Sequence, residues 1–210
     1  MALGKLAMRA TCRIAAAVVC AALVAVGTSH SQDGDTAGGL TGRLLVATPD
    51  LRDPNFSRTV IYIVEDGPGG TIGFIVNRPL GAGPAARVLE LFGVDGEGEE
   101  GNLRVHLGGP VQPSAGSILH SPDYVGDETT VVDENFALST HHGIVRAIAR
   151  GEGPQNSLIV FGYAGWAPGQ LDAEMAEEAW VDVPADVEIV FDREIESKWQ
   201  RALDLHRVDL

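Results

Sequence analysis

Ser157-Leu-Ile-Val-Phe-Gly-Tyr-Ala-Gly-Trp-Ala-Pro-Gly-Gln-Leu-Asp-Ala-Glu-Met-Ala-Glu-Glu-Ala-Trp180 is the stretch of sequence that decides the fold of this chain. Residues 158–161 are an apolar run that is too short for a helix, which favours a buried strand. Glycines and a proline then interrupt the chain over residues 162–169. From Gln170 as far as Ala179, apolar residues recur at every fourth position, which is helical spacing. The stretch predicts a strand, a glycine-rich turn and a helix, in that order.

The glycine-rich turn has two interpretations. Gly162, Gly165 and Gly169 lie between a strand and a helix, where freed backbone N–H groups can face a ligand. Alternatively, these glycines only allow Tyr163 and Trp166 to fold back over the core, which is the commoner use of such turns. The residues of this stretch leave both interpretations open.

Three strands are predicted on the N-terminal side of this stretch. Gly42–Thr48 is the first, and the next two, Thr59–Glu65 and Thr71–Asn77, are rich in β-branched residues. Asp66–Gly70 has the length and composition of a hairpin loop between these two strands. Because residues 60–64 are apolar at successive positions, we expect a sheet that is covered on both faces.

The remaining elements are predicted from periodicity and turn signals. They are helices at Pro84–Phe92, Leu138–Arg150 and Glu194–Leu205, and strands at Leu103–Leu107, Ser117–His120 and Val187–Phe191. Residues 122–135 are polar and are predicted to form loops, apart from Val131-Val132. A length of 210 residues with a hydrophobic fraction of 45% fits one domain with an appendage.

The N-terminus has the order of a secretory signal peptide. Lys5, Arg9 and Arg13 give a basic start, and Ile14–Gly27 is an unbroken run of small and apolar residues. Such a run is short for a membrane span. We therefore expect residues 1–27 to be a cleaved signal peptide and the protein to be exported, to the periplasm or another extracytoplasmic location.

The leader also sets the predicted domain organisation. Residues 28–39 are small and polar and are predicted to form a flexible linker, which leaves residues 40–210 as the domain. Cleavage near Ser31 is an alternative. An uncleaved leader would tie the protein to a membrane, and a mis-assigned start codon would leave it in the cytoplasm.

Composition excludes several classes of function. The chain has 29 Asp and Glu residues against 15 Lys and Arg, a formal net charge of -14. Because this charge repels phosphate backbones, we expect no nucleic-acid partner. Both cysteines, Cys12 and Cys20, lie in the leader, so a chain cleaved after Gly27 has no disulfide and no thiol catalysis.

The chain lacks the common sequence motifs of metal, nucleotide and catalytic sites. None of the six histidines has HExxH spacing, and the adjacent His141-His142 would diverge by roughly 100° on a helix, which disfavours a shared metal. Gly108-Gly109-Pro110 is not followed by the Lys-Ser/Thr of a Walker A loop, and there is no GxSxG motif. His120, Ser121 and Asp123 resemble a triad fragment, but triads are not built from sequence neighbours. We therefore predict no catalytic residue, no metal site and no cofactor.

Polar residues and glycines near strand ends form the candidate binding site. Arg58 and Arg78 stand out, since a guanidinium can hold an anion in an otherwise acidic chain. The alternative is that each pairs with an internal carboxylate or a helix end. The residues predicted to line one cleft, for a small anionic ligand or a protein partner, are Asn55, Arg58, Thr59, Asn77, Arg78, Gly108, Gly109, Tyr163, Gly165, Trp166 and Gln170.

Six linked motifs resemble the AlgH/YqgE family of bacterial proteins. In order, they are Leu45-Val-Ala-Thr-Pro49, Asp53-Pro-Asn-Phe-Ser-Arg-Thr-Val-Ile-Tyr62, Gly73-Phe-Ile-Val-Asn-Arg-Pro-Leu80, Gly108-Gly-Pro-Val111, Gly162-Tyr-Ala-Gly-Trp-Ala-Pro-Gly-Gln-Leu171, and Ile189-Val-Phe-Asp192 followed by Trp199 and Ala202. The resemblance covers about residues 40 to 205. It implies an α+β (α/β-like) domain with a curved, mostly antiparallel sheet forming a pseudo-barrel, flanked by helices. The family is named from transcriptional control of alginate synthesis and its molecular activity is unsettled, so it supplies no catalytic residues.

This sequence departs from the family pattern at several places. Many relatives have a cysteine in the strand occupied here by Ile63-Val64, so a thiol-based role is absent. Asp172 and Glu178 stand where relatives usually have Glu and Asn, and Ser139-Thr-His-His142 replaces a Ser/Thr-rich helix start. Most relatives also lack an export signal. An exported member could not regulate transcription directly.

Two classes of function follow from these observations. The first is a non-enzymatic binding or regulatory accessory protein that uses the predicted cleft. The second is an uncharacterised hydrolase or transferase that uses Asp53, Glu65 or His106 with the arginines. A cytoplasmic transcriptional regulator is a weaker third interpretation, because the charge of the chain opposes DNA binding. The absence of a recognisable pair of nucleophile and base favours the first.

Overall fold

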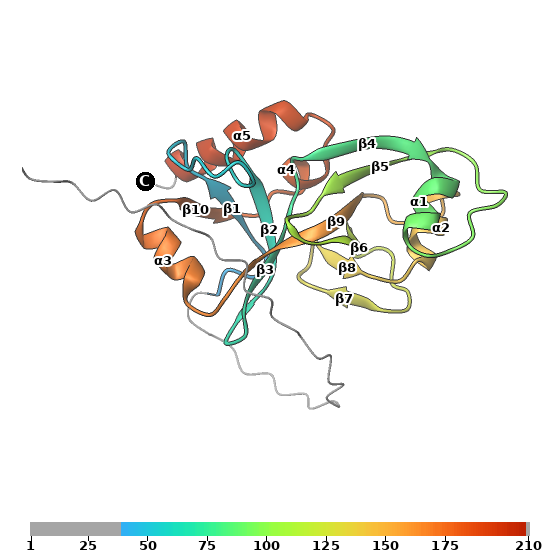
Figure 1. Ribbon diagram of the computed structural model, residues 1–210, viewed down its shortest axis with the longest axis horizontal. Coiled ribbons are helices and arrows are strands. Elements are labelled where there is room, and N and C mark those ends of the chain that lie inside the picture. Colours follow the sequence, from blue (N-terminus) through green and yellow to red (C-terminus); the bar gives the residue numbers. More distant parts are fainter. Residues whose placement is uncertain (1–38, 209–210) are drawn as a thin grey trace, which may run out of the picture. The chain divides into compact units, whose positions relative to one another are not determined.

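The computed structural model describes residues 39–208, which form a curled ten-stranded sheet flanked by helices (Figure 1). The strands are β1 (Arg43–Ala47), β2 (Val60–Gly67), β3 (Gly70–Ile75), β4 (Pro79–Pro84), β5 (Asn102–Leu107), β6 (Val111–His120), β7 (Thr129–Val131), β8 (Ala137–Ser139), β9 (Ser157–Trp166) and β10 (Trp180–Pro184). The helices are α1 (Ala85–Leu91), α2 (Gly143–Ala149), α3 (Gln170–Ala176), α4 (Val187–Phe191) and α5 (Ile195–Val208). The predicted signal peptide and nearly all of the predicted linker lie outside the described residues. Within residues 39–208, no helix is long and apolar enough to span a membrane.

The sheet confirms the predicted curved, mostly antiparallel α+β architecture. Its strands follow the order β10-β1-β2-β3-β9-β6-β8-β7, and β4 and β5 form a branch that joins β9. Every pairing is antiparallel except that of β5 with β9. The predicted hairpin of β2 and β3 is confirmed, with Ile61 opposite Ile75 and Gly67 opposite Gly70.

Strand β9 joins the two parts of the sheet, and it is longer than predicted. Residues 157–161 pair with β6, and residues 159–161 also pair with β5 on the other side, whereas residues 164–166 pair with β3. Between these parts Gly162 has φ of 73°, and a Cβ there would lie 2.4 Å from the carbonyl oxygen of Gly109. The glycines therefore bend the strand and admit a close backbone neighbour, and only residues 167–169 form the predicted turn.

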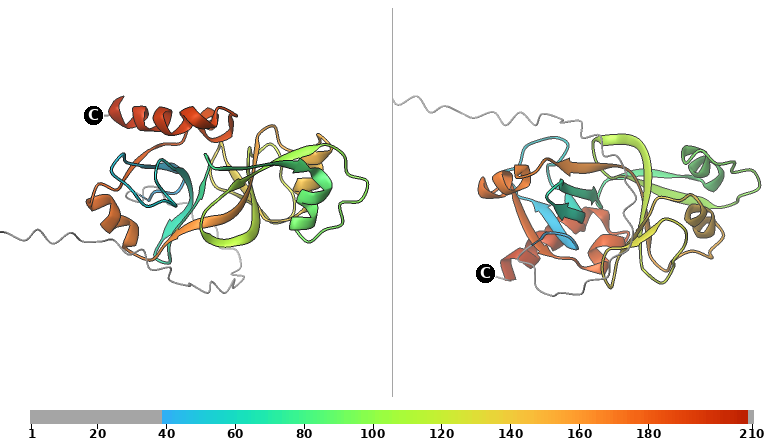
Figure 2. Two further views of the ribbon diagram at one scale, coloured as in Figure 1. Left: turned by 45° about the horizontal axis from the view of Figure 1, so that its top comes forward. Right: turned by 90° about the horizontal axis from the view of Figure 1, so that it is seen from below.

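Two layers of helix enclose the part of the sheet that contains β1, β2 and β3. Leu44 and Tyr62 face one side, where α5 packs with Trp199, and Leu45 and Ile61 face the other, with α3 beyond them. Figures 1 and 2 show α5 and α3 on opposite sides of these strands. The prediction of a sheet covered on both faces is confirmed here, since hydrophobic residues at successive positions require burial on each side.

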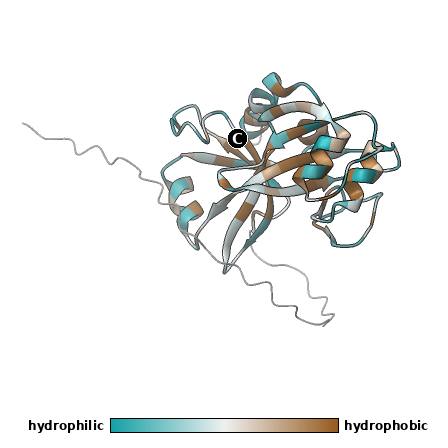
Figure 3. Cartoon of the chain, turned by 45° about the vertical axis from the view of Figure 1, so that its right-hand side comes forward, coloured by the Kyte–Doolittle hydropathy of each residue, from teal (hydrophilic) through white to brown (hydrophobic). Residues whose placement is uncertain are grey.

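A third cluster of hydrophobic residues lies where α1 and α2 pack against β5, β6 and β9. Val88 and Leu89 of α1 meet Ile144 and Val145 of α2 over Ile159. Coloured by hydropathy, α1 and α2 carry both hydrophobic and hydrophilic residues, as amphipathic helices do (Figure 3). Of these two helices, α2 contributes Ile148 to the lining of the pocket described below.

The predicted strand at Val187–Phe191 is wrong, because this segment forms the short helix α4. The carboxylate of Asp186 caps the helix by accepting a hydrogen bond from the backbone N–H of Ile189 at 2.8 Å. A cap of this kind starts a helix even where β-branched residues follow. The last strand is instead β10, which ends at Pro184 and pairs with β1.

The predicted helix at residues 138–150 begins later than expected. Leu138 belongs to β8, and α2 begins only at Gly143. His141 and His142 therefore precede the helix, and their rings lie 4.2 Å apart instead of diverging. Strand β4 was not predicted because its glycines and prolines lack strand propensity. It forms because its backbone pairs with β5, although its own sequence has no strand pattern.

Candidate functional site

Four residues of the predicted cleft connect the loop before β2 to the end of β3 through hydrogen bonds. The side chain of Asn77 accepts a hydrogen bond from the backbone N–H of Val60 and donates one to the carbonyl of Arg58, both at 2.9 Å. The hydroxyl of Thr59 donates to the carbonyl of Phe56 at 2.7 Å. The guanidinium of Arg78 donates to the carbonyl of Ser57 at 2.8 Å, so the polar atoms of these side chains hold the loop in place.

Arg58 and Asn55 lie in the same loop. The guanidinium carbon of Arg58 lies 4.5 Å from the ring centroid of Trp199 on α5, in a cation–π contact. The backbone N–H of Asn55 donates to the carboxylate of Asp53 at 2.8 Å, which closes the turn. Arg58 thus contacts an aromatic ring in this structure, and its role in holding an anion stays a prediction.

Gly108 and Gly109 form a close backbone crossing with β9. A Cβ on Gly108 would lie 2.2 Å from the carbonyl oxygen of Gly162, and one on Gly109 would lie 2.1 Å from the carbonyl carbon of Tyr163. The carbonyl of Gly108 also accepts a hydrogen bond from the backbone N–H of Ile75 at 2.8 Å. Glycine is required at this crossing by the approach of the chain itself.

Tyr163, Gly165, Trp166 and Gln170 lie on β9 and at the start of α3. Tyr163 pairs with β6 and Gly165 with β3. The indole of Trp166 and the amide of Gln170 both donate to the carboxylate of Glu174, at 3.0 and 2.9 Å.

Glu174 was not among the residues predicted to line the cleft. It also accepts a hydrogen bond from the indole of Trp180 at 2.9 Å. The ring of Phe56 stacks on Trp166 at 6.2 Å and meets Trp180 edge-on at 5.6 Å, which brings the Asn55–Arg58 loop to the same place. The four-residue spacing of Gln170 and Glu174 was the only available signal for this cluster.

The structure thus gathers the predicted site residues into two neighbouring clusters whose polar groups largely bind one another. Phe56 fills the space between the loop and the β9–α3 turn, and the backbone of β9 fills the space beside Gly108 and Gly109. Their role in binding a ligand stays a prediction.

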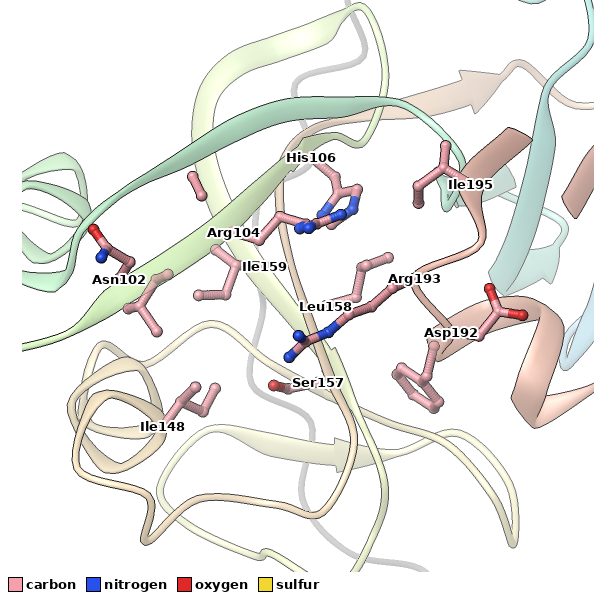
Figure 4. Close-up of a pocket in the computed structure, with 13 residues that line it drawn as sticks. Asn102, Arg104, His106, Ile148, Ser157, Leu158, Ile159, Asp192, Arg193 and Ile195 are labelled. Atoms are coloured by element: carbon pink, nitrogen blue, oxygen red, sulfur yellow. The ribbon is translucent and has the colours of Figure 1, made fainter. Parts of the chain in front are cut away.

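A cavity of about 420 Å³ lies elsewhere, between β5, β9 and the connection of α4 to α5 (Figure 4). Its lining residues are Ala82, Asn102, Leu103, Arg104, His106, Ile148, Ser157, Leu158, Ile159, Phe191, Asp192, Arg193 and Ile195. We call it the arginine pocket, because the side chains of Arg104 and Arg193 extend into it from two sides. Residues alternate between the faces of a strand, so Asn102, Arg104 and His106 of β5 share the face that lines it.

His106 is the most unusual side chain of the arginine pocket. It is only 3% exposed, and neither of its ring nitrogens has a hydrogen-bond partner among residues 39–208. Burial, reinforced by the positive charge of Lys198, lowers the pKa of His106 to about 4. The backbone of Ile159 lies close enough to favour the protonated ring, but outside hydrogen-bond geometry. The ring is therefore neutral at pH 7, with one donor and one acceptor unused.

The two guanidinium groups that line the pocket with His106 have no partner among the described residues either. Arg104 comes from β5 and Arg193 from the link between α4 and α5. Within the described part of the chain, neither forms an ion pair or a side-chain hydrogen bond, whereas Arg43, Arg87 and Arg150 each pair with a carboxylate. Figure 4 shows Arg193 reaching across the pocket towards Ser157 of β9.

Asp192 is the one carboxylate in the lining of the arginine pocket, and it is already neutralised. It forms an ion pair with Arg201 and lies 3.9 Å from the ammonium group of Lys198. Lys198 is fully buried and donates to the carbonyl of Val190 at 2.6 Å, and burial lowers its pKa to about 8. The pocket is therefore locally positive in a chain whose net charge is -14.

The other acidic candidates for chemistry do not reach this pocket. Asp53 holds the turn before β2, and Glu65 lies on β2; neither lines the cavity around His106. Among the described residues, no group of three or more His, Cys, Asp or Glu side chains could hold a metal ion. Of the three proposed acid–base residues, only His106 lines the arginine pocket.

Comparison with known proteins agrees with the motifs. The family model described as AlgH-like matches residues 44–210. A UPF0301 protein of Methylococcus capsulatus is 42% identical over 163 residues, covering 78% of this chain and 89% of that protein. One from Afipia carboxidovorans is 40% identical over 179 residues, covering 81% of this chain and 85% of that protein.

Solved structures give the same result for the fold. The solution structure of the AlgH protein from Pseudomonas aeruginosa matches with a TM-score of 0.70 and 37% identity, covering 83% of this chain and 93% of that one. A Corynebacterium diphtheriae protein shares the fold at a TM-score of 0.63 and 20% identity, with 80% of this chain and 87% of that one covered. The chain therefore belongs to the AlgH/YqgE family, the AlgH-like UPF0301 proteins, as its six linked motifs predicted.

Proposed function

We propose that this protein is an exported accessory protein that binds a small anionic ligand in the arginine pocket. The observation that carries the proposal is the buried ring of His106, which has no hydrogen-bond partner among residues 39–208 and lines the same pocket as the unpaired guanidinium groups of Arg104 and Arg193. The proposal keeps the class of ligand that the sequence predicted. It moves the site from the Asn55–Arg78 region to β5, β9 and the connection of α4 to α5.

Charge and size both favour a small anion. Each guanidinium can donate two parallel hydrogen bonds to a carboxylate or phosphate, and these bonds are stronger than those between neutral groups. The cavity of about 420 Å³ lies at the low end of the range of about 300–1,000 Å³ that is usual for small-molecule sites. A macromolecular anion is disfavoured by the net charge of -14 of the chain.

The state of His106 adds a second requirement. A buried polar group without a partner costs about 1–3 kcal/mol, so a ligand that satisfies the ring gains that free energy. A neutral imidazole has one N–H donor and one acceptor nitrogen. The best ligand therefore carries an anionic group for Arg104 and Arg193 and, near it, a hydroxyl or an amine for His106.

Binding explains the arginine pocket better than catalysis does. A catalytic histidine needs a group that orients its ring, usually a carboxylate or a carbonyl at hydrogen-bond distance. His106 has no such partner within the described residues, and Asp192 is bound to Arg201 and Lys198. The pocket is thus arranged to hold a charged group, and we assign it no reaction.

Export is supported by the sequence of the leader, with its basic start and its apolar run over Ile14–Gly27. It agrees with the acidic composition, which disfavours direct binding to DNA. An extracytoplasmic anion-binding protein could act through a protein partner. We propose that such a partner binds at the surface around Asn55 and Arg78.

Calorimetric titration of the purified protein with inorganic phosphate, succinate and citrate at low ionic strength tests the proposal. We expect saturable binding of at least one of these anions, weakened about tenfold or more by Arg104→Gln and by Arg193→Gln. Arg87→Gln is the matched control, because Arg87 lies on α1 with its side chain 75% exposed and pairs with Glu90. The absence of saturable binding, or equal binding by the pocket variants and the wild type, would overturn the proposal.

A further inference from the structure

A second hollow, of about 270 Å³, lies at the far edge of the sheet between β7, β8 and the start of α2. Tyr124, Thr129, Ser139, His141 and Ile144 line it. Ser139 is opposite Ile118 in the pairing of β8 with β6, and Ile118 packs against Ile144. The side chain of Ser139 therefore lies on the face of the sheet that turns towards α2 and the hollow.

The hydroxyl of Ser139 is hydrogen-bonded to a buried histidine that is distant in sequence. The Nε2 atom of His120 lies 2.9 Å from Oγ of Ser139, and its Nδ1 atom lies 2.8 Å from the carbonyl oxygen of Ser121. His120 is 0% exposed and Ser139 1% exposed. The hydroxyl of Ser121 points elsewhere, since it donates to Asp123.

The direction of each hydrogen bond in this group follows from chemistry. A carbonyl oxygen can only accept, so Nδ1 of His120 carries the proton and donates to Ser121. In the neutral ring Nε2 is then the acceptor, and Ser139 must donate to it. Thr129, whose Oγ1 lies 2.7 Å from Oγ of Ser139 and accepts from the backbone N–H of Gly126, is left to donate to Ser139.

This arrangement has the parts of an activated serine. A base accepts the hydroxyl proton, and a carbonyl fixes the tautomer and orientation of that base, which is the role that a carboxylate has in a triad. Burial lowers the pKa of His120, so the ring is neutral and able to accept a proton at pH 7. Sequence reasoning missed the pair because Ser139 is 19 residues from His120 and is placed beside it by the pairing of β6 with β8.

We propose that Ser139 is a nucleophile that accepts a short acyl group from a neutral ester, with His120 as its general base. The cavity of about 270 Å³ limits the acyl group to a short chain. Asp127 also lines the cavity and disfavours an anionic substrate, which distinguishes this site from the arginine pocket. This activity is separate from anion binding. It corresponds to the hydrolase or transferase that the sequence offered as an alternative, but at a different site.

The proposed reaction needs no reactant other than the ester and water. Oγ of Ser139 forms a bond to the ester carbonyl carbon while its proton passes to Nε2 of His120. The bond from that carbon to the ester oxygen then breaks, and His120 gives the proton to the departing alcohol. Water, activated by the same ring, releases the acyl group as a carboxylic acid and restores the Ser139 hydroxyl.

The test is reaction of the intact protein with p-nitrophenyl acetate and with an ethyl fluorophosphonate probe, followed by intact mass measurement and peptide mapping. We expect one added group, mapped to Ser139, and a slow release of p-nitrophenol. Ser139→Ala should abolish both, and His120→Gln should slow labelling by about 100-fold or more. Ser114→Ala, an exposed serine on the same strand β6 as His120, is the matched control and should react like the wild type.

The location of the label decides the matter even if a variant fails to fold, since it is mapped on the wild-type chain. Absence of labelling, labelling at another residue, or labelling of Ser139 at an unchanged rate in folded His120→Gln would each overturn the proposal. In those cases the hydrogen bonds of His120 serve only to satisfy a buried ring.

Discussion

The carboxylate of Glu174 on α3 accepts a hydrogen bond from the indole of Trp180 on β10 at 2.9 Å. The same carboxylate holds Trp166 and Gln170, so one side chain connects β9, α3 and β10. Both tryptophans are buried, with exposed fractions of 5% and 2%. Glu174 therefore fixes the region where the sequence predicted a ligand-facing turn.

Glu174→Ala is expected to destabilise the protein by about 3 kcal/mol, because it leaves two buried indole N–H groups without their acceptor. The free energy of unfolding, measured by denaturant titration, checks this. Glu177→Ala on the exposed side of the same segment should change it by less than about 0.5 kcal/mol. Equal effects of the two substitutions would show that the Glu174 hydrogen bonds contribute little.

The pKa of about 4 for His106 predicts a dependence of stability on pH. An unfolded histidine titrates near pH 6.5, so between about pH 6.5 and 4 the unfolded chain binds more protons at this position than the folded chain. The contribution of His106 to the free energy of unfolding is fully present above about pH 6.5. It is lost as the pH falls towards 4, by up to about 3 kcal/mol.

Substitution separates this contribution from those of other groups. In His106→Gln, the loss of unfolding free energy between pH 7 and pH 4 should be smaller than in the wild type. His206→Gln on α5, whose side chain is partly exposed, is the control variant. A His106→Gln profile identical to that of the wild type would contradict the burial of a neutral ring.

Gly109→Ala tests the backbone crossing between residues 108–109 and β9. Gly109 has φ of 157°, and a Cβ would lie 2.1 Å from the carbonyl carbon of Tyr163, so neither side chain nor backbone can yield cheaply. We expect a loss of more than about 2 kcal/mol, seen as a lower melting temperature. Gly83→Ala on β4, where no atom lies within 4 Å of the new Cβ, is the control and should be nearly neutral.

The proposed export predicts the N-terminus of the mature protein. Mass measurement and N-terminal sequencing of the protein from fractionated cells should find a chain that starts near Thr28 or Gln32 in an extracytoplasmic fraction. A cytosolic chain that keeps Met1 would contradict export and would favour a cytoplasmic, regulatory interpretation.

Much of the sheet could be predicted because local patterns and tertiary structure agree there. The hairpin of β2 and β3 combines β-branched strands with a loop rich in glycine, and it pairs as expected. At Val187–Phe191 the local sequence pattern and the structure disagree. The apolar run favours a strand, but the Asp186 cap and packing against α5 make a helix. Strand β4 depends wholly on its partner and has no local signal.

The arginine pocket shows why a site is harder to predict than a strand. The alternation of Asn102, Arg104 and His106 on β5 could be seen in the sequence, and it places all three on one face. Arg193 joins them only because α4 turns the chain back, and Ser157 only because β5 and β9 pair in parallel. In the same way, neither the contact of Arg58 with Trp199 nor the hydrogen bond of Arg78 to a backbone carbonyl could be predicted from the sequence.

The most direct test of the central claim is nuclear magnetic resonance of the His106 ring during titration with inorganic phosphate. We expect the ring nitrogen resonances to shift saturably and the pKa of His106 to rise from about 4, because an anion beside the ring favours its protonated form. Both changes should be lost in Arg193→Gln. A ring that does not respond, while resonances around Arg58 and Arg78 shift, would contradict the account and return the site to the cleft predicted from the sequence.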